Sequence, residues 1–363
     1  MRKPLIAGFL GLACALSLAA CSDDSPGPSG TETTGGDITI GSVVYKFDDT
    51  FMSSMREAMT KQASSAGVTI DIQDGLNDQA RENELVNNFV TQGVDVLAIN
   101  PVKADIIDPV LQSAKEAGLP IVFFNKQPSD TVMNSYDKAY YVGAKAEDSG
   151  TMMGEILAEY FKDYPAADKN GDGMIQFVML TGEINHQDAV LRSQYSQQAL
   201  QDAGLISAGC FDINTWSQST SPNECMLANQ TANWDTAAAT DLMNNWITSL
   251  GLENIEAVIA NNDDMGLGAI AALQANGYNA TGTKGDPAKY IPVVAVDATD
   301  KGKAALAAGS LLGTVLNDAV NQGQAVVNLS IAAARGDVSD ATVGYPITDG
   351  KFIWIPYVKV TEA

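Results

Sequence analysis

The chain has little positive charge. Its 363 residues hold 21 lysines and arginines against 44 aspartates and glutamates, which leaves a formal net charge of −23. Because phosphate backbones and anionic lipid surfaces would repel such a protein at long range, the composition argues against nucleic-acid binding. Charged residues are only 18% of the chain and hydrophobic residues 45%, so the sequence indicates a folded protein rather than an acidic disordered one.

Cysteines and phosphate-binding loops are also scarce. Four cysteines in a chain of this length exclude a disulfide-stapled mini-protein. No glycine-rich phosphate loop follows an expected strand, which argues against nucleotide binding. At about 100–200 residues per domain, the length predicts two or three domains.

The first twenty residues have the features of an export signal. Arg2 and Lys3 precede the apolar run Leu5–Ala20, which has the length of a signal-peptide hydrophobic region and is too short to span a bilayer comfortably. The run ends in Leu18–Cys21, which resembles a bacterial lipobox, whose cysteine is lipidated and becomes N-terminal. The polar residues that follow are typical of a flexible tether. We expect a signal peptide over 1–20 and a tether over 21–37, with the exported protein held on the outer or periplasmic side of a bacterial membrane only by its lipid.

Export predicts an oxidising compartment for the other cysteines. Cys14 lies in the expected signal peptide, which leaves Cys210 and Cys225 as a pair. The segment between them is polar and rich in serine, as in a surface loop. A disulfide is the expected state, and two free buried thiols are the alternative.

From Ile38 onward, short β-branched runs alternate with amphipathic stretches. Apolar runs that alternate with helices are typical of parallel sheets covered on both faces. The sequence therefore predicts an α/β fold of two doubly wound parallel-sheet lobes. The expected strands are 38–44, 68–72, 94–99, 120–124, 175–180, 257–260, 292–296 and 312–315. Helices are expected over 79–92 and 104–117, and starting near 50, 148, 189, 236, 265 and 301.

Polar side chains follow most of these strands. Ligands of doubly wound sheets bind outside the carboxyl ends of the strands, so a recurring set there favours a ligand site. Any one of these residues taken alone could be a helix N-cap or a turn residue. The set is Asp48, Asp49, Phe51, Asn100, Asn125, His186, Asp188, Arg192, Asn261, Asn262, Asp263, Asp297, Asn317 and Asp318.

Six segments of the chain match the sequence pattern of one known family: Tyr45–Met52, Val122–Pro128, Ser135–Gly143, Asn233–Thr236, Val258–Asp263 and Gly313–Asp318. In these segments the chain resembles the galactose/glucose-binding periplasmic receptors of bacterial ABC transport, which are type I periplasmic binding proteins. The resemblance covers nearly all of 38–360. It implies a monomer with a three-segment hinge near Gly143, Ala319 and Gly350. The N-terminal lobe would be 38–143 plus 319–350, and the C-terminal lobe 144–318 plus 351–363.

The resemblance also implies a sugar site. Phe51 and Trp234 match the positions where the family stacks aromatic rings on the two faces of a pyranose, whose C–H groups suit such rings. Taken alone, either ring would more often belong to the core. For the i, i+4 pair Asp188 and Arg192, a helix-face salt bridge is the alternative. The family's polar positions match Asp49, Asn125, His186, Asp188, Arg192, Asn262, Asp297 and Asn317, which could satisfy sugar hydroxyls.

Residues 168–176 form a separate motif that resembles an EF-hand calcium loop. Oxygen-bearing side chains occupy loop positions one, three, five and nine, which are Asp168, Asn170, Asp172 and Gln176. Position six is Gly173, and position seven, which binds calcium through its backbone carbonyl, is Met174. Position twelve is Met179 instead of a bidentate glutamate, so a plain polar turn is the alternative. The family resemblance implies that Glu256 supplies the missing ligand and that the loop holds a structural Ca²⁺.

These features together predict a receptor and not an enzyme. It would bind D-galactose, D-glucose or both between the lobes and deliver the sugar to an ABC-type permease, with a chemoreceptor or sensor as a further partner. The alternative is an exported sugar hydrolase that uses the cleft carboxylates, since paired carboxylates beside a sugar are also glycosidase machinery. A sugar-responsive repressor of this fold would need a basic helix-turn-helix at the N-terminus, where this chain has a signal and a tether.

The lipobox interpretation can be tested by cell fractionation. Replacing Cys21 by Ser removes the sulfur that would carry the lipid, so the protein should move from the membrane pellet to the detergent-free supernatant. Cys14→Ser, a change within the expected signal peptide, is the matched control and should leave the protein in the pellet. A Cys21→Ser protein that remains membrane-bound contradicts the interpretation.

Overall fold

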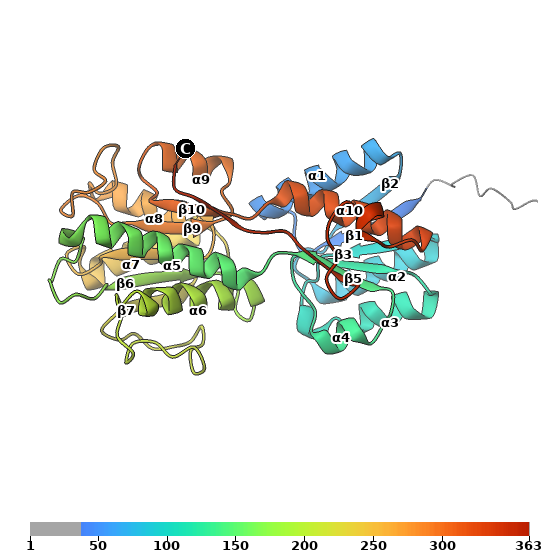
Figure 1. Ribbon diagram of the computed structural model, residues 1–363, viewed down its shortest axis with the longest axis horizontal. Helices are drawn as coiled ribbons and strands as arrows, with labels where there is room; N and C mark the ends of the chain where they lie inside the picture. The colour runs from blue at the N-terminus through green and yellow to red at the C-terminus, as the bar shows by residue number, and fades with distance from the viewer. Residues whose placement is uncertain (1–37, 363) are drawn as a thin grey trace, which may run out of the picture. The chain divides into compact units, whose positions relative to one another are not determined.

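The computed structural model describes residues 38–362. The expected signal peptide, the tether and Cys21 lie outside this range. The described chain forms two α/β lobes, each built on a six-stranded sheet, which confirms the predicted fold class (Figure 1). Within 38–362, no helix is both long enough and apolar enough to cross a bilayer.

The sheet of the N-terminal lobe has the strand order β11-β5-β4-β3-β1-β2, and all of its strands are parallel. These strands are β1 (Thr39–Val44), β2 (Thr69–Asp74), β3 (Val96–Ile99), β4 (Ile121–Phe124), β5 (Ala139–Gly143) and β11 (Phe352–Trp354). The helices of this lobe are α1 (Thr50–Ala66), α2 (Gln79–Gln92), α3 (Asp108–Ala117), α4 (Asp130–Asn134), α10 (Ala319–Arg335) and α11 (Asp340–Val343), with a 3₁₀ turn, η1 (Ala104–Ile106). Helices α1 and α10 cover one face of the sheet, and α2 and α3 cover the other.

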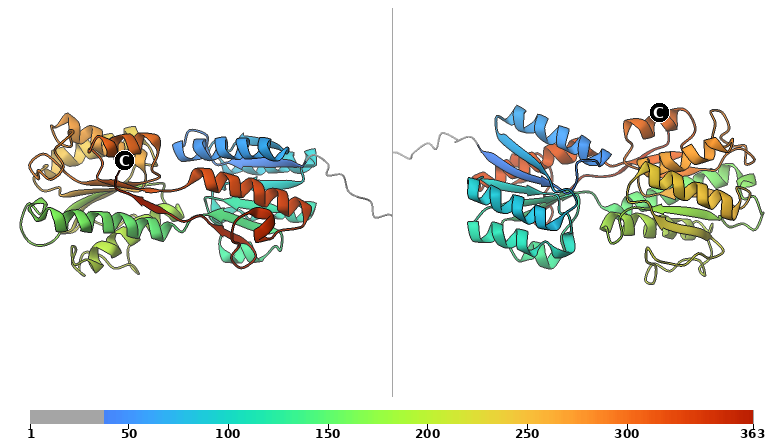
Figure 2. Two further views of the ribbon diagram at one scale, coloured as in Figure 1. Left: turned by 45° about the horizontal axis from the view of Figure 1, so that its top comes forward. Right: turned by 180° about the vertical axis from the view of Figure 1, so that it is seen from behind.

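The sheet of the C-terminal lobe has the order β12-β10-β9-β8-β6-β7, with β12 antiparallel at one edge. Its strands are β6 (Phe177–Thr181), β7 (Met226–Thr231), β8 (Ala257–Ala260), β9 (Val293–Val296), β10 (Gly313–Leu316) and β12 (Val358–Val360). The helices are α5 (Ala146–Asp163), α6 (Gln187–Asp202), α7 (Thr236–Leu250), α8 (Asp263–Ala275) and α9 (Asp300–Ala307), with a 3₁₀ turn, η2 (Pro165–Ala167). Helix α5 packs on one side of this sheet, and α7 and α8 pack on the other (Figure 2).

The local sequence explains why these elements begin and end where they do. The central strands β3, β4, β8 and β9 are short apolar runs that are buried along their whole length, as expected for strands with both faces covered. Helices α1, α2 and α3 each end at a glycine in the left-handed conformation, which other residues adopt only at a cost. Asp49 and Asp78 cap the N-termini of α1 and α2 by accepting backbone N–H groups.

One predicted lobe boundary is wrong. The family resemblance implied a last crossing near Gly350 and therefore placed 351–363 in the C-terminal lobe. Instead, Phe352–Trp354 forms β11 and pairs with β5 in the sheet of the N-terminal lobe. This short apolar run buries Phe352 and Ile353 against that lobe, so the chain crosses only afterwards and enters β12 at Val358. Strands β5 and β7 and helix α10 were not anticipated either.

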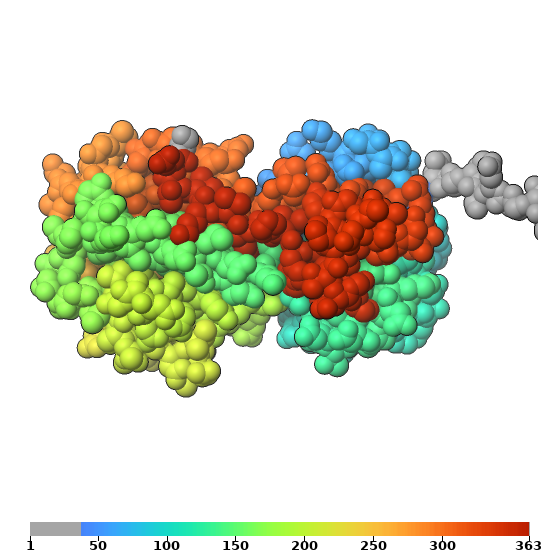
Figure 3. All heavy atoms as spheres, viewed as in Figure 1, coloured from blue at the N-terminus to red at the C-terminus, as the bar shows by residue number. Residues whose placement is uncertain are grey.

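A loop between α6 and β7 is closed by a disulfide. Cys210 and Cys225 are bonded with an S–S distance of 2.02 Å. Beside the disulfide, Phe211 and Trp216 are buried in the core of the C-terminal lobe. In the space-filling view this segment lies on the surface of the lobe, in yellow-green (Figure 3).

Candidate functional site

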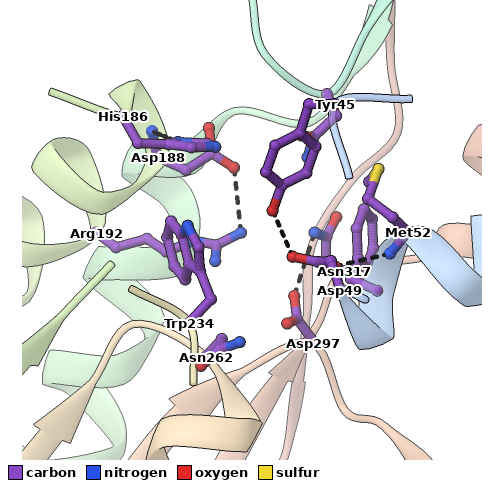
Figure 4. A pocket seen from close by; sticks show the side chains of 12 residues that line it. Tyr45, Asp49, Met52, His186, Asp188, Arg192, Trp234, Asn262, Asp297 and Asn317 are labelled. Atoms are coloured by element: carbon purple, nitrogen blue, oxygen red, sulfur yellow. Dashed lines mark hydrogen bonds and ion pairs between the residues drawn. The ribbon is translucent and has the colours of Figure 1, made fainter. Parts of the chain in front are cut away.

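A pocket lined by residues of both lobes lies at the carboxyl ends of the strands. All ten residues that the sequence predicted for a sugar site line it, together with two that were not predicted, Tyr45 and Met52 (Figure 4). The other strand-end residues, Asp48, Asn100, Asn261, Asp263 and Asp318, do not line this pocket. The structure therefore separates the candidates into pocket residues and neighbouring residues, a distinction that the sequence pattern alone does not make.

Asp49 is held in place by two hydrogen bonds. Its Oδ1 accepts the backbone N–H of Met52 at 2.8 Å, which caps α1, and its Oδ2 accepts the hydroxyl of Tyr45 at 2.6 Å (Figure 4). Burial, with a further contribution from the Asp49 charge, raises the pKa of Tyr45 well above 10, so its hydroxyl stays a donor. Asp49 is thus both a helix cap and a fixed acceptor in the pocket.

Asn125 lines the pocket from the end of β4. It follows β4 with a positive φ of 59°, a conformation that asparagine tolerates better than most residues. Its Oδ1 accepts the Nδ2 of Asn100 at 3.1 Å, and its backbone carbonyl accepts the hydroxyl of Tyr141 at 2.7 Å. Because Oδ1 has this partner, the Nδ2 of Asn125 remains available as a donor. Asn100 supports the pocket from behind it.

Arg192 is a buried cation whose partners are nearly all in the C-terminal lobe. Its Nη2 lies 3.2 Å from Oδ2 of Asp188 and 3.1 Å from the hydroxyl of Tyr357, and Nη1 donates to the carbonyl of Asn261 at 2.8 Å. Burial alone would lower the pKa of Arg192, but Tyr357, Asp188 and Asp297 raise it by more, so the guanidinium stays charged. Tyr357 was missed because it lies on the last crossing segment and not at the end of a strand.

His186 is neutral with a defined tautomer. Its Nδ1 accepts the backbone N–H of Asp188 at 3.2 Å, so the ring proton is on Nε2. Burial is the largest cause that lowers its pKa well below 6.5, and the charges of Lys126 and Arg192 act in the same direction. The ring meets Trp234 edge-on, with centroids 5.0 Å apart. His186 can therefore donate one hydrogen bond from Nε2.

Asp188 and Asp297 are buried acceptors. Burial raises the pKa of both carboxyls, and the charge of Arg192 partly offsets this rise. The Nδ2 of Asn317 lies 3.3 Å from Oδ1 of Asp297, and the Oδ1 of Asn317 accepts Gln322 at 2.6 Å. Asp297 has a φ of 114°, a strained backbone conformation of the kind that clusters at functional sites.

Two aromatic rings come from different lobes. Phe51 lies on α1, and Trp234 lies in the turn before α7 with a φ of 66°. Gly182 lies so close to the Trp234 ring that a Cβ there would overlap it. The Nε1 of Trp234 is buried without a partner among the described residues. Two rings with donors and acceptors around them can hold a neutral, polyhydroxylated ring.

The loop 168–176 lies apart from this pocket. Glu256 accepts the backbone N–H groups of Lys169 at 2.6 Å and of Gln176 at 3.0 Å, which places its carboxylate against the loop. Oδ2 of Asp172 and Oε1 of Gln176 lie 2.9 and 3.1 Å from Nδ2 of Asn170. These hard oxygen donors have the chemistry of a calcium site.

In the described structure, the carboxylates of this loop do not lie together around one point. Asp168 accepts the backbone N–H groups of Gly171 and Gly173, and its carboxylate does not lie within 4.8 Å of those of Asp172 and Glu256 together. In the part of the chain that the structure describes, the only such close group of three is Cys210, Glu224 and Cys225, whose cysteines form the disulfide. Binding of a cation by the loop would therefore require these carboxylates to turn from backbone N–H groups toward the ion.

Comparisons with known proteins identify the family of the chain. Residues 40–337 match a family described as "Periplasmic binding protein domain". The chain is 35% identical over 363 residues to a D-galactose/methyl-galactoside binding periplasmic protein of Haemophilus influenzae, covering all of this chain and 98% of that protein. It is 27% identical to a ribose import binding protein of Escherichia coli, covering 76% and 78% of the two chains.

A solved structure has the same fold as this chain. A solute-binding protein from Bacillus halodurans with bound myo-inositol superposes with a TM-score of 0.70 and 27% identity, covering 90% of this chain and 95% of that chain. The resemblance that the sequence motifs indicated is confirmed.

The protonation state of His186 can be measured directly, because it is the only histidine in the chain. Its burial and the nearby cations should keep the ring neutral, so its ¹H–¹³C NMR signals should not titrate between pH 8 and pH 5. The same titration in denaturant is the control and should give a midpoint near the usual value of about 6.5. A midpoint near 6.5 in the folded protein would contradict the described environment.

Proposed function

Since the chain belongs to the periplasmic binding protein family, we propose that it binds D-galactose, D-glucose or both in the pocket between its lobes and delivers the sugar to an ABC-type permease. The family and the relatives are sugar-binding receptors of ABC transporters. They are named for binding and not for a reaction, which argues against the hydrolase alternative. The observation that carries the proposal is that all ten predicted sugar-site residues line one pocket.

The aromatic pair favours a pyranose. A pyranose presents C–H groups on its two faces and hydroxyls around its edge, so it fits between two rings. Phe51 and Trp234 supply a ring from each lobe. Binding energy from both lobes would favour the arrangement in which they enclose the sugar, and a permease could recognise that arrangement.

The polar residues favour a specific pattern of hydroxyls. Asp49, Asp188 and Asp297 are acceptors, while Asn125, His186 and Arg192 can donate. Each buried group left without a partner would cost about 1–3 kcal/mol, so a sugar with a misplaced hydroxyl should bind about tenfold or more weakly. The relative from Haemophilus influenzae is named for galactose and methyl-galactoside.

The proposal includes four further features. We infer that the protein is exported and anchored through Cys21, which the lipobox-like segment supports. A chemoreceptor or sensor is a further partner of the same bound form, and the protein acts as a monomer. The loop 168–176 with Glu256 binds a structural Ca²⁺, supported by its oxygen donors and by the contacts of Glu256 with the loop backbone.

The sugar site is tested by isothermal titration calorimetry with D-glucose and D-galactose. Trp234→Ala removes a stacking face, and Asp188→Ala removes an acceptor and leaves Arg192 without its carboxylate partner. Each change should weaken binding at least about tenfold. Asp202→Ala, an exposed change on the same helix as Asp188, is the matched control and should bind like the wild type. Near-native affinity in either site variant would refute the assignment.

The calcium proposal is tested by thermal unfolding. Calcium at about a hundredfold excess over its Kd should raise Tm by roughly 5 °C relative to chelator, because only the folded loop would bind it. Glu256→Gln should abolish this difference, whereas Glu253→Gln, an exposed change nearby, should preserve it. A Tm that is the same in chelator and in calcium would rule the ion out.

A further inference from the structure

The disulfide-closed loop between α6 and β7 has no role in the site described so far. We propose that Gln218, on this loop, is a positioning residue that affects sugar affinity. It holds in place the turn that carries Glu183, and Glu183 forms ion pairs with two lysines of the other lobe beside the sugar site. The inference rests on the proposed sugar-binding function and adds residues outside the pocket that set its affinity.

The side chain of Gln218 hydrogen-bonds to the backbone of the turn that follows β6. Its Oε1 accepts the backbone N–H of Asn185 at 2.7 Å, and its Nε2 lies 3.3 Å from the backbone carbonyl of Glu183. One side chain thus binds two backbone groups of the turn Glu183–His186, in which the N–H of His186 also donates to the carbonyl of Glu183. Asn185 has a φ of 63°, which costs backbone energy unless the surroundings hold it. Gln218 supplies such support.

The loop that carries Gln218 is itself fixed to the C-terminal lobe. The disulfide Cys210–Cys225 closes it, and the side chain of Trp216, two residues before Gln218, is buried in the lobe's core. The Nδ2 of Asn223 donates to the carbonyl of Cys210 at 2.8 Å. The backbone carbonyl of Gln218 accepts the Nδ2 of Asn229 at 3.3 Å. Gln218 therefore lies on a segment that the disulfide, the buried Trp216 side chain and these hydrogen bonds hold in place.

Glu183 links the C-terminal lobe to the N-terminal lobe. Its Oε2 lies 3.2 Å from Nζ of Lys126, and its Oε1 lies 3.9 Å from Nζ of Lys46 and 3.4 Å from Nδ2 of Asn77. The side chains of Lys126 and Glu183 are only 8% and 18% exposed. A partly desolvated pair loses more when one partner is removed than an exposed pair does, because the other charge is left buried.

Both ends of this ion pair adjoin pocket residues. Lys126 directly follows Asn125, and its Nζ lies 3.8 Å from the centroid of the Tyr45 ring, whose hydroxyl holds Asp49. Glu183 precedes His186 by three residues in the same turn. The pair joins the lobes, so it would stabilise the arrangement in which they enclose a ligand by as much as the pair is stronger there. A displaced Glu183 should therefore reduce sugar affinity without removing any pocket side chain.

The test compares sugar affinities by calorimetric titration with D-glucose and D-galactose at low and high salt. The proteins are wild type, Glu183→Gln, Gln218→Ala, the double variant and Asn214→Ala. Asn214 is a control in the same loop, and among the described residues its side chain hydrogen-bonds only to Asp212. Glu183→Gln should weaken binding about tenfold and Gln218→Ala about threefold. The double variant should bind no more weakly than Glu183→Gln alone, because both changes act through one interaction.

Salt dependence separates positioning from a general structural effect. Salt screens the ion pairs of Glu183, so high salt should weaken sugar binding by the wild type and by Asn214→Ala. In Gln218→Ala and Glu183→Gln, sugar affinity should depend less on the salt concentration. Wild-type affinity and salt dependence in Gln218→Ala, or additive losses in the double variant, would overturn the inference.

A measurement without sugar keeps this inference separate from the proposed function. Amine-reactive labelling followed by peptide mass spectrometry should show faster modification of Lys126 in Gln218→Ala and Glu183→Gln than in wild type or Asn214→Ala. If wild type binds neither sugar but this difference appears, the proposed function fails and the positioning of Glu183 stands. If the labelling rates are equal, the positioning role fails.

Discussion

The buried guanidinium of Arg192 is the constraint around which the pocket is arranged. A cation out of water is stable only where nearby carboxylates and hydrogen-bond acceptors compensate it. Asp188, Tyr357 and the carbonyl of Asn261 provide that compensation by direct contact. The same charge partly offsets the rise in pKa that burial imposes on Asp188 and Asp297. Arg192 thereby limits the rise in the pKa of both carboxyls while its own nitrogens donate hydrogen bonds.

The fold supplies the directions in which these groups point. Parallel strands end at one edge of each sheet, and the helix that follows starts there with unpaired N–H groups. Asp49, His186 and Asn262 each accept such an N–H as the N-cap of α1, α6 and α8, and all three also line the pocket. The cap fixes one atom of each side chain. His186 and Asn262 each keep a nitrogen that makes no hydrogen bond among the described residues, and Oδ2 of Asp49, which accepts the Tyr45 hydroxyl, keeps a second lone pair for a ligand. The structural and ligand interpretations of these residues are therefore compatible.

The sequence predicted much of the fold and the composition of the site, for physical reasons that are visible in particular residues. Uninterrupted apolar runs such as Ile121–Phe124 identify buried strands, and the polar residues that follow them identify the edge of the sheet where a ligand binds. Short elements were not predicted. Phe352–Trp354 is too short to show the alternation of apolar and polar residues that marks a strand, and its pairing with β5 depends on contacts between residues distant in sequence. Tyr357 and Gln218 were missed because each acts from a crossing segment or a loop, where neither periodicity nor a strand end marks it.

The central claim is that two aromatic rings and a fixed set of donors and acceptors together select a hexopyranose. Calorimetric titration of the wild-type protein with D-glucose, D-galactose, D-ribose and myo-inositol tests it most directly. The account predicts that at least one of the two hexoses binds about tenfold or more tightly than ribose and myo-inositol, since each misplaced hydroxyl leaves a buried group unpaired. Ribose or myo-inositol binding as tightly as both hexoses, or more tightly, would contradict it.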